Sequence, residues 1–375
     1  MQPTELPTRP EDLSLDILNR IIARQRRDVA LSDFTIIEAH EWGGGHASSA
    51  GRMVIAPTYT ASSPDGLPRQ IVIKVAKNVP EARGGQNVGG TGTGQFYANE
   101  VNIYTRLRPA DFLESPLTLG GEYDPNTDTF VLLLEDLRDR DAVFATIKML
   151  TSRERMHSLL RQLAALHARY WNSPELGSAL LWLGSHASGA IHDLFNSETV
   201  AKFMDYQVGQ EQFKAEMIEY MGVTTTTLFD QVRRVQAHQS RLAQTICHGD
   251  MHIGNTYMLP GDKAGLLDWQ LASRGYCMHD ISYIIATALS TAERRSQERE
   301  LLDYYSEQLR ACGVAEPPAK DELWLEYRRA MAWNFHIGWL MTPVVNYGRD
   351  ITVMALLRLM TAYVDLETAK AIDSL

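Results

Sequence analysis

Cysteine is scarce in this chain of 375 residues, and it also lacks long apolar runs and an excess of positive charge. The three cysteines, Cys247, Cys277 and Cys312, are widely spaced and odd in number, which argues against a disulfide framework and a cysteine metal site. No apolar run approaches the length of a membrane span, and the N-terminus does not resemble a signal peptide. We therefore expect a cytoplasmic protein with no membrane partner.

The charge balance and the glycine-rich segments exclude further classes. The net charge is −10, whereas general nucleic-acid binding relies on lysine and arginine to neutralise phosphates, so we expect no nucleic-acid partner. No glycine-rich stretch ends in the Gly-Lys-Ser/Thr of a P-loop, and none has the strand-to-helix context of a dinucleotide fold. At 45% hydrophobic residues, the chain can bury one large core or two lobes.

What the chain does contain is a spaced set of oxygen ligands. Asp250 and Asn255 have the spacing of the catalytic-loop pattern H-x-D-x-x-x-x-N, and Asp268 follows an apolar run. Phosphoryl transfer needs a carboxylate to receive the hydroxyl proton and oxygen ligands to hold Mg²⁺ on the phosphates. We assign the first role to Asp250 and the second to Asn255 and Asp268. The turn-rich residues 260–263 predict a hairpin that brings both ligands to one metal.

The segment from Cys247 to Asp280 resembles the signature of the aminoglycoside phosphotransferase and choline kinase-like superfamily, with Gly249 before the catalytic Asp and Trp269 after the metal Asp. The resemblance implies a bilobal, protein-kinase-like α+β fold. A small N-terminal lobe would hold an antiparallel β-sheet and one key helix, and the larger C-terminal lobe would be mainly helical. It also implies that ATP and Mg²⁺ are cofactors, that Asp280 braces the catalytic loop and that His248 is structural.

Two charged residues upstream complete the pattern of a kinase. Lys74 lies in the β-branched run from Gln70 to Val75, which resembles the V-A-I-K strand that contacts phosphates. Glu100 lies in a segment with a helical apolar stripe, which leaves it free to pair with Lys74. A solvated surface charge is the alternative for each residue alone, and their order along the chain favours the ion pair.

An apolar run from Thr129 to Leu137, ended by acids, predicts the last strand of the small lobe and the hinge. We therefore expect a nucleotide-binding lobe at 1–134, a hinge at 135–137 and a catalytic and acceptor-binding lobe at 138–375. By the resemblance, Glu135 and Leu137 would contact the adenine edge through backbone groups. A plain buried strand followed by a loop explains the same letters.

Two glycine-rich stretches compete for the loop that covers the phosphates. The stretch 41–49 lies between two predicted strands, so we choose Gly44, Gly45 and Ser48 as phosphate contacts. The stretch 84–94 falls between the lysine strand and the glutamate helix, and we expect it to be a mobile insertion.

The acceptor should be recognised by the helical segments 172–244 and 321–375. The second segment is rich in aromatic residues, which could line an acceptor site but at helical spacing indicate core packing more often. Six acids of the first segment could bind an amine or form a solvated face: Asp193, Glu198, Asp205, Glu211, Glu216 and Glu219. By the resemblance, the helix predicted from Arg153 to Trp171 would pack beneath the catalytic loop, with a structural His167.

These features together predict an ATP- and Mg²⁺-dependent phosphotransferase that moves the γ-phosphoryl group to a hydroxyl of a small molecule. The acceptor would be an aminoglycoside-like antibiotic or a metabolite alcohol or sugar, and fold does not choose between them. A protein kinase would need a longer activation segment than 269–279 offers. A non-catalytic nucleotide-binding scaffold is the remaining alternative, and the retention of every catalytic residue argues against it.

Overall fold

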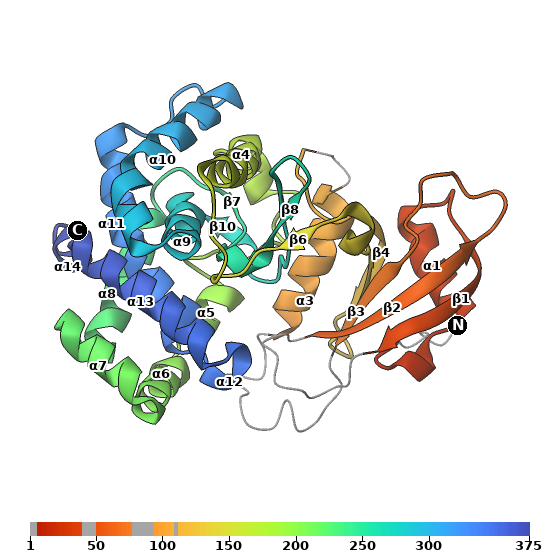
Figure 1. The fold of residues 1–375 in the computed structure, drawn as a ribbon, viewed down its shortest axis with the longest axis horizontal. Coiled ribbons are helices and arrows are strands. Elements are labelled where there is room, and N and C mark those ends of the chain that lie inside the picture. Colours follow the sequence, from red (N-terminus) through yellow and green to blue (C-terminus); the bar gives the residue numbers. More distant parts are fainter. Residues whose placement is uncertain (1–5, 40–49, 77–92, 109–111) are drawn as a thin grey trace. The chain divides into compact units, whose positions relative to one another are not determined.

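The computed structural model describes residues 6–39, 50–76, 93–108 and 112–375, and it divides the chain into two compact units. Unit 1 is Met1–Val143 and unit 2 is Phe144–Leu375 (Figure 1). The first holds a small antiparallel sheet and the second is mainly helical. Both features agree with the lobes expected from the sequence. Within the described residues, no helix combines the length and apolar character needed to cross a membrane.

Unit 1 is built on a five-stranded antiparallel sheet in the order β1-β2-β3-β5-β4. Its first two strands pair as a hairpin, as the sequence predicts, and the strand carrying Lys74 lies at its centre. The strands are β1 (Leu31–Ala39), β2 (Ala50–Tyr59), β3 (Ile71–Ala76), β4 (Thr118–Asp124) and β5 (Thr129–Glu135). Because alternate side chains of a strand point to opposite faces, each central strand contributes side chains to both faces of the sheet.

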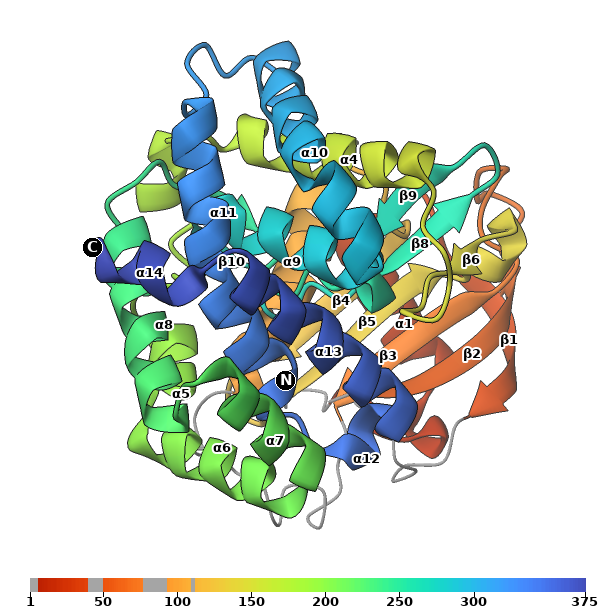
Figure 2. The ribbon, with the colours of Figure 1, turned by 60° about the vertical axis from the view of Figure 1, so that its left-hand side comes forward.

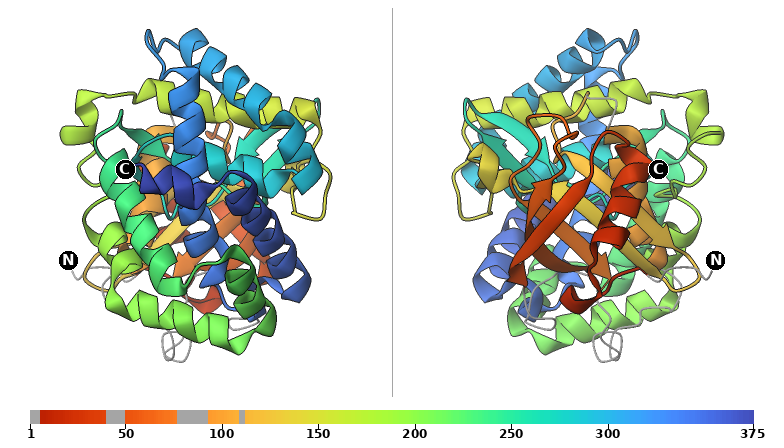
Figure 3. Two further views of the ribbon diagram at one scale, coloured as in Figure 1. Left: turned by 90° about the vertical axis from the view of Figure 1, so that its left-hand side faces the viewer. Right: turned by 90° about the vertical axis from the view of Figure 1, so that its right-hand side faces the viewer.

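One face of this sheet is covered by helix α1 (Leu15–Gln25), which follows the short 3-10 helix η1 (Pro10–Asp12). The hydroxyl of Ser14 accepts a hydrogen bond from the Ile17 amide and thereby caps the N-terminus of the helix. Leu18, Ile21 and Ile22 of the helix are buried against apolar side chains of the sheet, Ile73 and Val75 among them. Figure 3 shows α1 lying across this face.

The opposite face of the sheet carries Lys74, which alternates with the buried Ile73 and Val75 on β3. Helix α3 (Thr93–Asn102) contacts β4 and β5 and continues as the π-helix η2 (Ile103–Leu107). The period-2 pattern of β3 therefore directs its one cation away from the apolar core under α1.

After β5 the chain enters the 3-10 helix η4 (Leu137–Arg140), whose N-cap is Asp136. The Asp136 carboxylate accepts hydrogen bonds from the Arg138 amide and guanidinium, and the Asp136 amide bonds the Gln70 carbonyl. The predicted hinge residues 135–137 thus lie inside unit 1, which ends within the short strand β6 (Val143–Phe144). The predicted lobe boundaries stay a prediction.

Unit 2 is organised around helix α9 (Met278–Ala288), which is buried along its whole length. Helices α4, α10, α11 and α13 all contact it (Figure 2). The other helices of unit 2 are α4 (Arg153–Arg169), α5 (Ala190–Asn196), α6 (Glu198–Gln210), α7 (Gln212–Met221), α8 (Thr225–Gln239), α10 (Thr291–Ala311), α11 (Lys320–Phe335), α12 (Val344–Tyr347), α13 (Arg349–Asp365) and α14 (Thr368–Asp373), with 3-10 helices η5 (Pro174–Gly177) and η6 (Ile253–Asn255) and the π-helix η7 (His336–Leu340).

The predicted hairpin after the catalytic loop is present. Strands β8 (Thr256–Leu259) and β9 (Lys263–Leu266) pair antiparallel, and the turn places both Gly261 and Asp262 at positive φ. Glycine and aspartate are among the residues that tolerate this backbone region best. A second pair, β7 (Thr245–Cys247) with β10 (Ser273–Gly275), frames the start of the same loop.

Most residues of the two glycine-rich stretches lie outside the residues that the structure describes. Gly44, Gly45 and Ser48, chosen as phosphate contacts, lie outside the described residues. The same holds for 84–92 of the second stretch, whereas Thr93 and Gly94 begin helix α3.

The closest approach of α1 to the sheet gives a testable prediction. A Cβ on Gly120 of β4 would lie 2.7 Å from the Ile21 carbonyl oxygen, which belongs to helix backbone and cannot swing away. We expect Gly120→Ala to destabilise unit 1 by about 1–3 kcal/mol, the usual range for overpacking. Thermal unfolding would measure this, with Gly177→Ala as the control because no atom lies within 4 Å of its added Cβ. Equal melting temperatures for the two variants would contradict the prediction.

Candidate active site

The ion pair expected in unit 1 is present. The Lys74 ammonium lies 2.5 Å from Oε1 of Glu100, and the two side chains are 17% and 1% exposed. Tyr97, one helical turn before Glu100, stacks on Phe130 of β5 with ring centroids 4.4 Å apart, which fixes α3 on the sheet. Removing either partner of so buried a pair would leave an uncompensated charge. The role of Lys74 and Glu100 in holding phosphates stays a prediction.

The hinge candidates have defined local roles. The Glu135 carboxylate accepts hydrogen bonds from the Leu117 amide at 2.7 Å and from Arg140 at 2.9 Å. Leu137 opens η4, and its carbonyl accepts a bond from the Ala142 amide. The Glu135 carboxylate is therefore already used in hydrogen bonds within unit 1. An adenine contact here would have to use backbone groups, as the resemblance implies.

The catalytic loop of unit 2 makes a turn that only glycine fits. Gly249 has φ +85°, and an added Cβ would lie 1.9 Å from the Leu271 carbonyl oxygen. Glycine alone reaches this backbone region without steric cost and lets the two chain segments approach. The glycine of the His-Gly-Asp motif is thus explained by packing against the segment that follows Asp268.

The buried carboxylate of Asp280 holds this turn through hydrogen bonds to its backbone. One of its oxygens accepts the His248 amide at 2.6 Å and the other accepts the Gly249 amide at 2.9 Å. Burial alone would raise the pKa of Asp280, but the hydrogen bond from His167 and the electrostatic effect of the neighbouring histidines together outweigh it, and the pKa is lowered. The bracing role that the resemblance implies for Asp280 agrees with these contacts.

A second support comes from His279, which the sequence analysis missed. Its Nε2 lies 3.0 Å from the Gly249 carbonyl and donates to it, so Gly249, the residue before Asp250, is held at both its amide and its carbonyl. Burial lowers the pKa of His279, so the ring is neutral and keeps one N–H. Only its adjacency to Asp280 in sequence hinted at this role.

Asp250 and Asn255 are directly joined. The Asn255 amide nitrogen donates to the Asp250 carbonyl at 2.8 Å and to its carboxylate at 3.1 Å. The Asp250 side chain is 29% exposed, whereas Asn255 is buried. One carboxylate is thus oriented by its neighbour and remains accessible to a reactant.

Asp268 lies beside Asn255 at the open end of the hairpin. The Leu267 amide donates to the Asn255 carbonyl at 2.9 Å, and His248 bonds the Leu267 carbonyl at 2.7 Å, which supports the structural role expected for His248. Asp268 itself has φ +61°, a left-handed backbone region that few non-glycine residues adopt and that recurs at functional sites. Gln270 donates to its Oδ1 at 2.5 Å.

The residues at the open end of the hairpin fit Mg²⁺. Asn255 and Asp268 offer amide and carboxylate oxygens, the hard ligands that Mg²⁺ prefers. Because the Asn255 nitrogen is committed to Asp250, its amide oxygen is the atom left for a cation.

The comparisons with known proteins agree with this geometry. The sequence model of the ecdysteroid kinase-like family matches residues 75–313, more than half of the chain, and the match includes the catalytic loop and Asp280. The chain belongs to the ecdysteroid kinase-like family. No curated protein matches it.

Two solved structures share the fold of this ecdysteroid kinase-like protein. A choline kinase from Cryptosporidium parvum is 10% identical with a TM-score of 0.55, and the alignment covers 94% of this chain and 96% of that one. An ethanolamine kinase from Plasmodium vivax is 12% identical with a TM-score of 0.51, covering 90% and 82%. The predicted bilobal, protein-kinase-like fold is confirmed.

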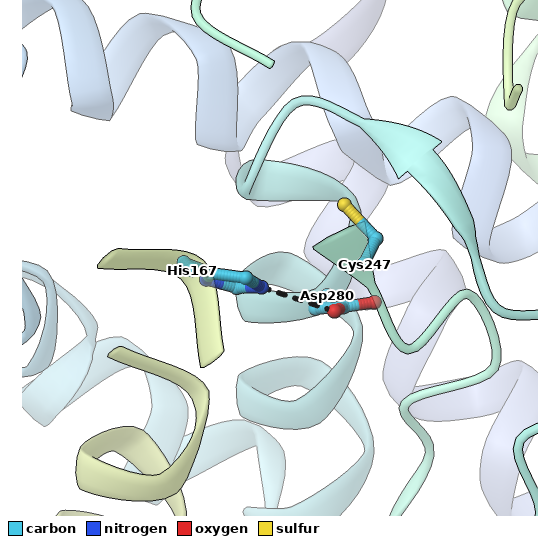
Figure 4. A group of neighbouring side chains, drawn as sticks. All are labelled: His167, Cys247 and Asp280. Atoms are coloured by element: carbon cyan, nitrogen blue, oxygen red, sulfur yellow. Dashed lines mark hydrogen bonds and ion pairs between the residues drawn. The ribbon is translucent and has the colours of Figure 1, made fainter. Parts of the chain in front are cut away.

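One buried group of this ecdysteroid kinase-like chain has the composition of a metal site. The ligand atoms of His167, Cys247 and Asp280 lie within 4.8 Å of one another (Figure 4). However, Asp280 already binds two amides and His167, and the other nitrogen of His167 lies 2.7 Å from the Tyr305 hydroxyl. Burial also raises the pKa of the Cys247 thiol and disfavours the thiolate that a metal needs. The group is a hydrogen-bonded support of the loop.

A set of aromatic residues borders Asp250, and we call it the aromatic cluster: His252, Tyr283, Trp339 and Tyr347. The ring centroid of Trp339 is 4.8 Å from Tyr347 and 5.7 Å from His252. His252 Nε2 lies 3.8 Å from the Asp250 carboxylate. Burial raises the pKa of Tyr347, and the charges of Asp250 and Asp268 add to this shift.

The sequence analysis found part of this cluster. Trp339 stood among the aromatic residues of 321–375, most of which are core residues, such as Tyr327 and Phe335. His252 and Tyr283 were missed because they lie in other segments, and Tyr347, although within 321–375, was not singled out because it stands at no motif position. The Trp339 indole nitrogen lies near the Tyr283 hydroxyl, but neither atom reaches hydrogen-bond geometry with a residue that the structure describes.

Four of the six acids considered as an amine site have separate partners. Asp193 pairs with His192, Asp205 with Thr225, and Glu211 with Arg349. Glu216 bonds Gln212 of its own helix. Their separate partners favour the solvated helix faces that were the alternative.

The turn at Gly249 yields a prediction for the loop. We expect Gly249→Ala to lower Mg²⁺-dependent ADP release from ATP about 100-fold or more, because the methyl group must displace the loop by roughly 1 Å. Gly209→Ala on α6 is the matched control, since nothing lies within 4 Å of its added Cβ. Near-normal ADP release by Gly249→Ala would show that the close contact with Leu271 does not set the position of Asp250.

Proposed function

We propose that this protein transfers the γ-phosphoryl group of ATP, with Mg²⁺, to a hydroxyl group of a small molecule. The observation that carries the proposal is the joined pair of Asp250 and Asn255 on a braced loop, with Asp268 at the adjoining hairpin end. Membership of a kinase-like family supports phosphoryl transfer in general. We further propose a cytoplasmic location, supported by three free cysteines, and no nucleic-acid or membrane partner.

Each residue has a role that follows from its contacts. Asp250 orients the acceptor hydroxyl and accepts its proton as the oxygen attacks the γ-phosphorus, and the Asn255 amide fixes the Asp250 carboxylate. Asn255 and Asp268 hold Mg²⁺, which neutralises charge on the phosphates. Lys74, kept in place by Glu100, steadies the phosphates from the nucleotide-binding side. Glu135 and Leu137 contact the adenine through their backbone, and Gly44, Gly45 and Ser48 cover the phosphates.

The acceptor class follows from the aromatic cluster beside Asp250. Aromatic faces favour a ring-bearing or apolar alcohol. Ecdysteroids, which give the family its name, are alcohols of this kind. An aminoglycoside-like polycation fits the site less well, because four of the six acids that could bind its amines have separate partners.

The alternatives differ in what they require. A non-catalytic scaffold would bind ATP without transfer, and the intact geometry of Asp250, Asn255 and Asp268 argues against it. A protein kinase would need a peptide-binding activation segment, but the residues between Asp268 and Asp280 form a turn, strand β10 and the start of α9.

The proposed reaction is tested by removing one charge. Asp250→Asn should lower acceptor-stimulated ADP release about 10²–10⁴-fold, the usual contribution of a general base, while ATP affinity changes less than about twofold. The acceptors to compare are ecdysone, choline, ethanolamine, kanamycin and glucose. Asp262→Asn, on the hairpin turn of the same unit, is the control. Stoichiometric ATP binding without stimulation by any acceptor would support the scaffold instead.

The acceptor assignment is tested at Trp339. Trp339→Leu should raise the KM of a ring-bearing acceptor about five- to tenfold, because the stacking surface and the indole N–H are lost, and leave the KM of ATP unchanged. Trp324→Leu removes a tryptophan that lies under the Arg299 guanidinium and not in the aromatic cluster. Equal effects of the two substitutions on acceptor KM would rule out a direct role for Trp339.

A further inference from the structure

A lysine with no exposed surface holds the end of the segment that carries Trp339. Lys214 of helix α7 donates from its ammonium to the Leu340 carbonyl at 2.8 Å and to the Thr342 carbonyl at 2.7 Å. Lysine is almost never fully buried unless it is paired. These two bonds therefore mark a position where a buried cation has a specific structural use.

The two carbonyls lie at the end of a helix and in the turn that follows it. Leu340 is the last residue of the π-helix η7, and Thr342 lies in the turn before α12. A cation at a helix C-terminus binds the free carbonyls and complements the negative end of the dipole. Burial lowers the pKa of Lys214 to about 8, with Glu211 opposing the shift, so the side chain is still mostly charged at neutral pH.

The position of this cap matters because aromatic side chains flank it in sequence. Trp339 precedes the first capped residue, and Tyr347 ends α12 a few residues after the second. Their rings are 4.8 Å apart, and both lie about 6 Å from the His252 ring, at 5.7 Å and 6.2 Å. The backbone between Trp339 and Tyr347 is thus held by a side chain of α7, a helix that contains neither residue.

The geometry points to Lys214 as a positioning residue for the acceptor. We infer that its ammonium fixes the turn 340–342 and thereby sets Trp339 and Tyr347 at the distance from Asp250 that acceptor binding needs. This inference rests on the proposed function, because it assumes that the aromatic cluster binds the acceptor. Lys214 itself is fully buried and acts only through the turn.

The test combines a readout that needs no substrate with one that does. Lys214→Met should speed amide hydrogen exchange in peptides covering 336–347. With the panel alcohol that the wild type uses best among ecdysone, choline, ethanolamine, kanamycin and glucose, the acceptor KM should rise about tenfold, while kcat and the KM of ATP stay within about twofold. Lys214→Arg, which keeps donors and charge, should restore part of the loss. If Lys214→Met does not fold, Lys214→Gln, with a shorter neutral donor, replaces it.

The matched control is Arg328→Met. Arg328 caps another helix end by donating to the Leu366 carbonyl at 2.6 Å, so its loss should speed exchange near residue 366 and leave the acceptor KM unchanged. Unchanged exchange at 336–347 in Lys214→Met would overturn the inference. So would faster exchange with an unchanged acceptor KM, or an equal rise in the KM of ATP. If the wild type phosphorylates no panel member, the proposed function fails for these acceptors, and the exchange result alone decides whether Lys214 holds the turn.

Discussion

The carboxylate of Asp280 is the point on which the catalytic geometry depends. A tight turn at Gly249 leaves consecutive backbone amides without strand partners, and a buried amide without an acceptor is costly. Asp280 satisfies the amides of His248 and Gly249 with one oxygen each. Its own burial is tolerable because it lies in the first turn of α9, where the helix dipole favours negative charge, and because His167 bonds it.

The loop is therefore held by helices that were already needed for packing. α9 is buried along its length and supplies both Asp280 and His279, while α4 supplies His167. The hairpin of β8 and β9 then places Asn255 and Asp268 at its open end. Catalytic groups fixed in this way need little rearrangement during reaction, which is how preorganised sites lower a barrier.

The acceptor side is built differently from the catalytic loop. Trp339 and Tyr347 lie beyond residues 75–313, the span matched by the family, and they depend on a turn capped by Lys214. The aromatic residues proposed to face the acceptor are thus divided, because Trp339 and Tyr347 lie outside the matched span whereas His252 and Tyr283 lie within it. Such a division would let acceptor preference vary within a family while the loop around Asp250 is kept.

The sequence by itself determined the elements whose cause is local. The alternation of β3, the Ser14 cap, the turn 260–263 of the hairpin and the spacing of Asp250, Asn255 and Asp268 follow from periodicity, turn chemistry and motif spacing, and the structure has each of them. The tertiary structure alone decided which residues from distant segments meet. Nothing local in His279, Tyr283 or Lys214 shows that they contact the Gly249 carbonyl, the aromatic cluster or the turn after Leu340. Those contacts arise from helix packing, where the partner and not the residue's own neighbours sets its role.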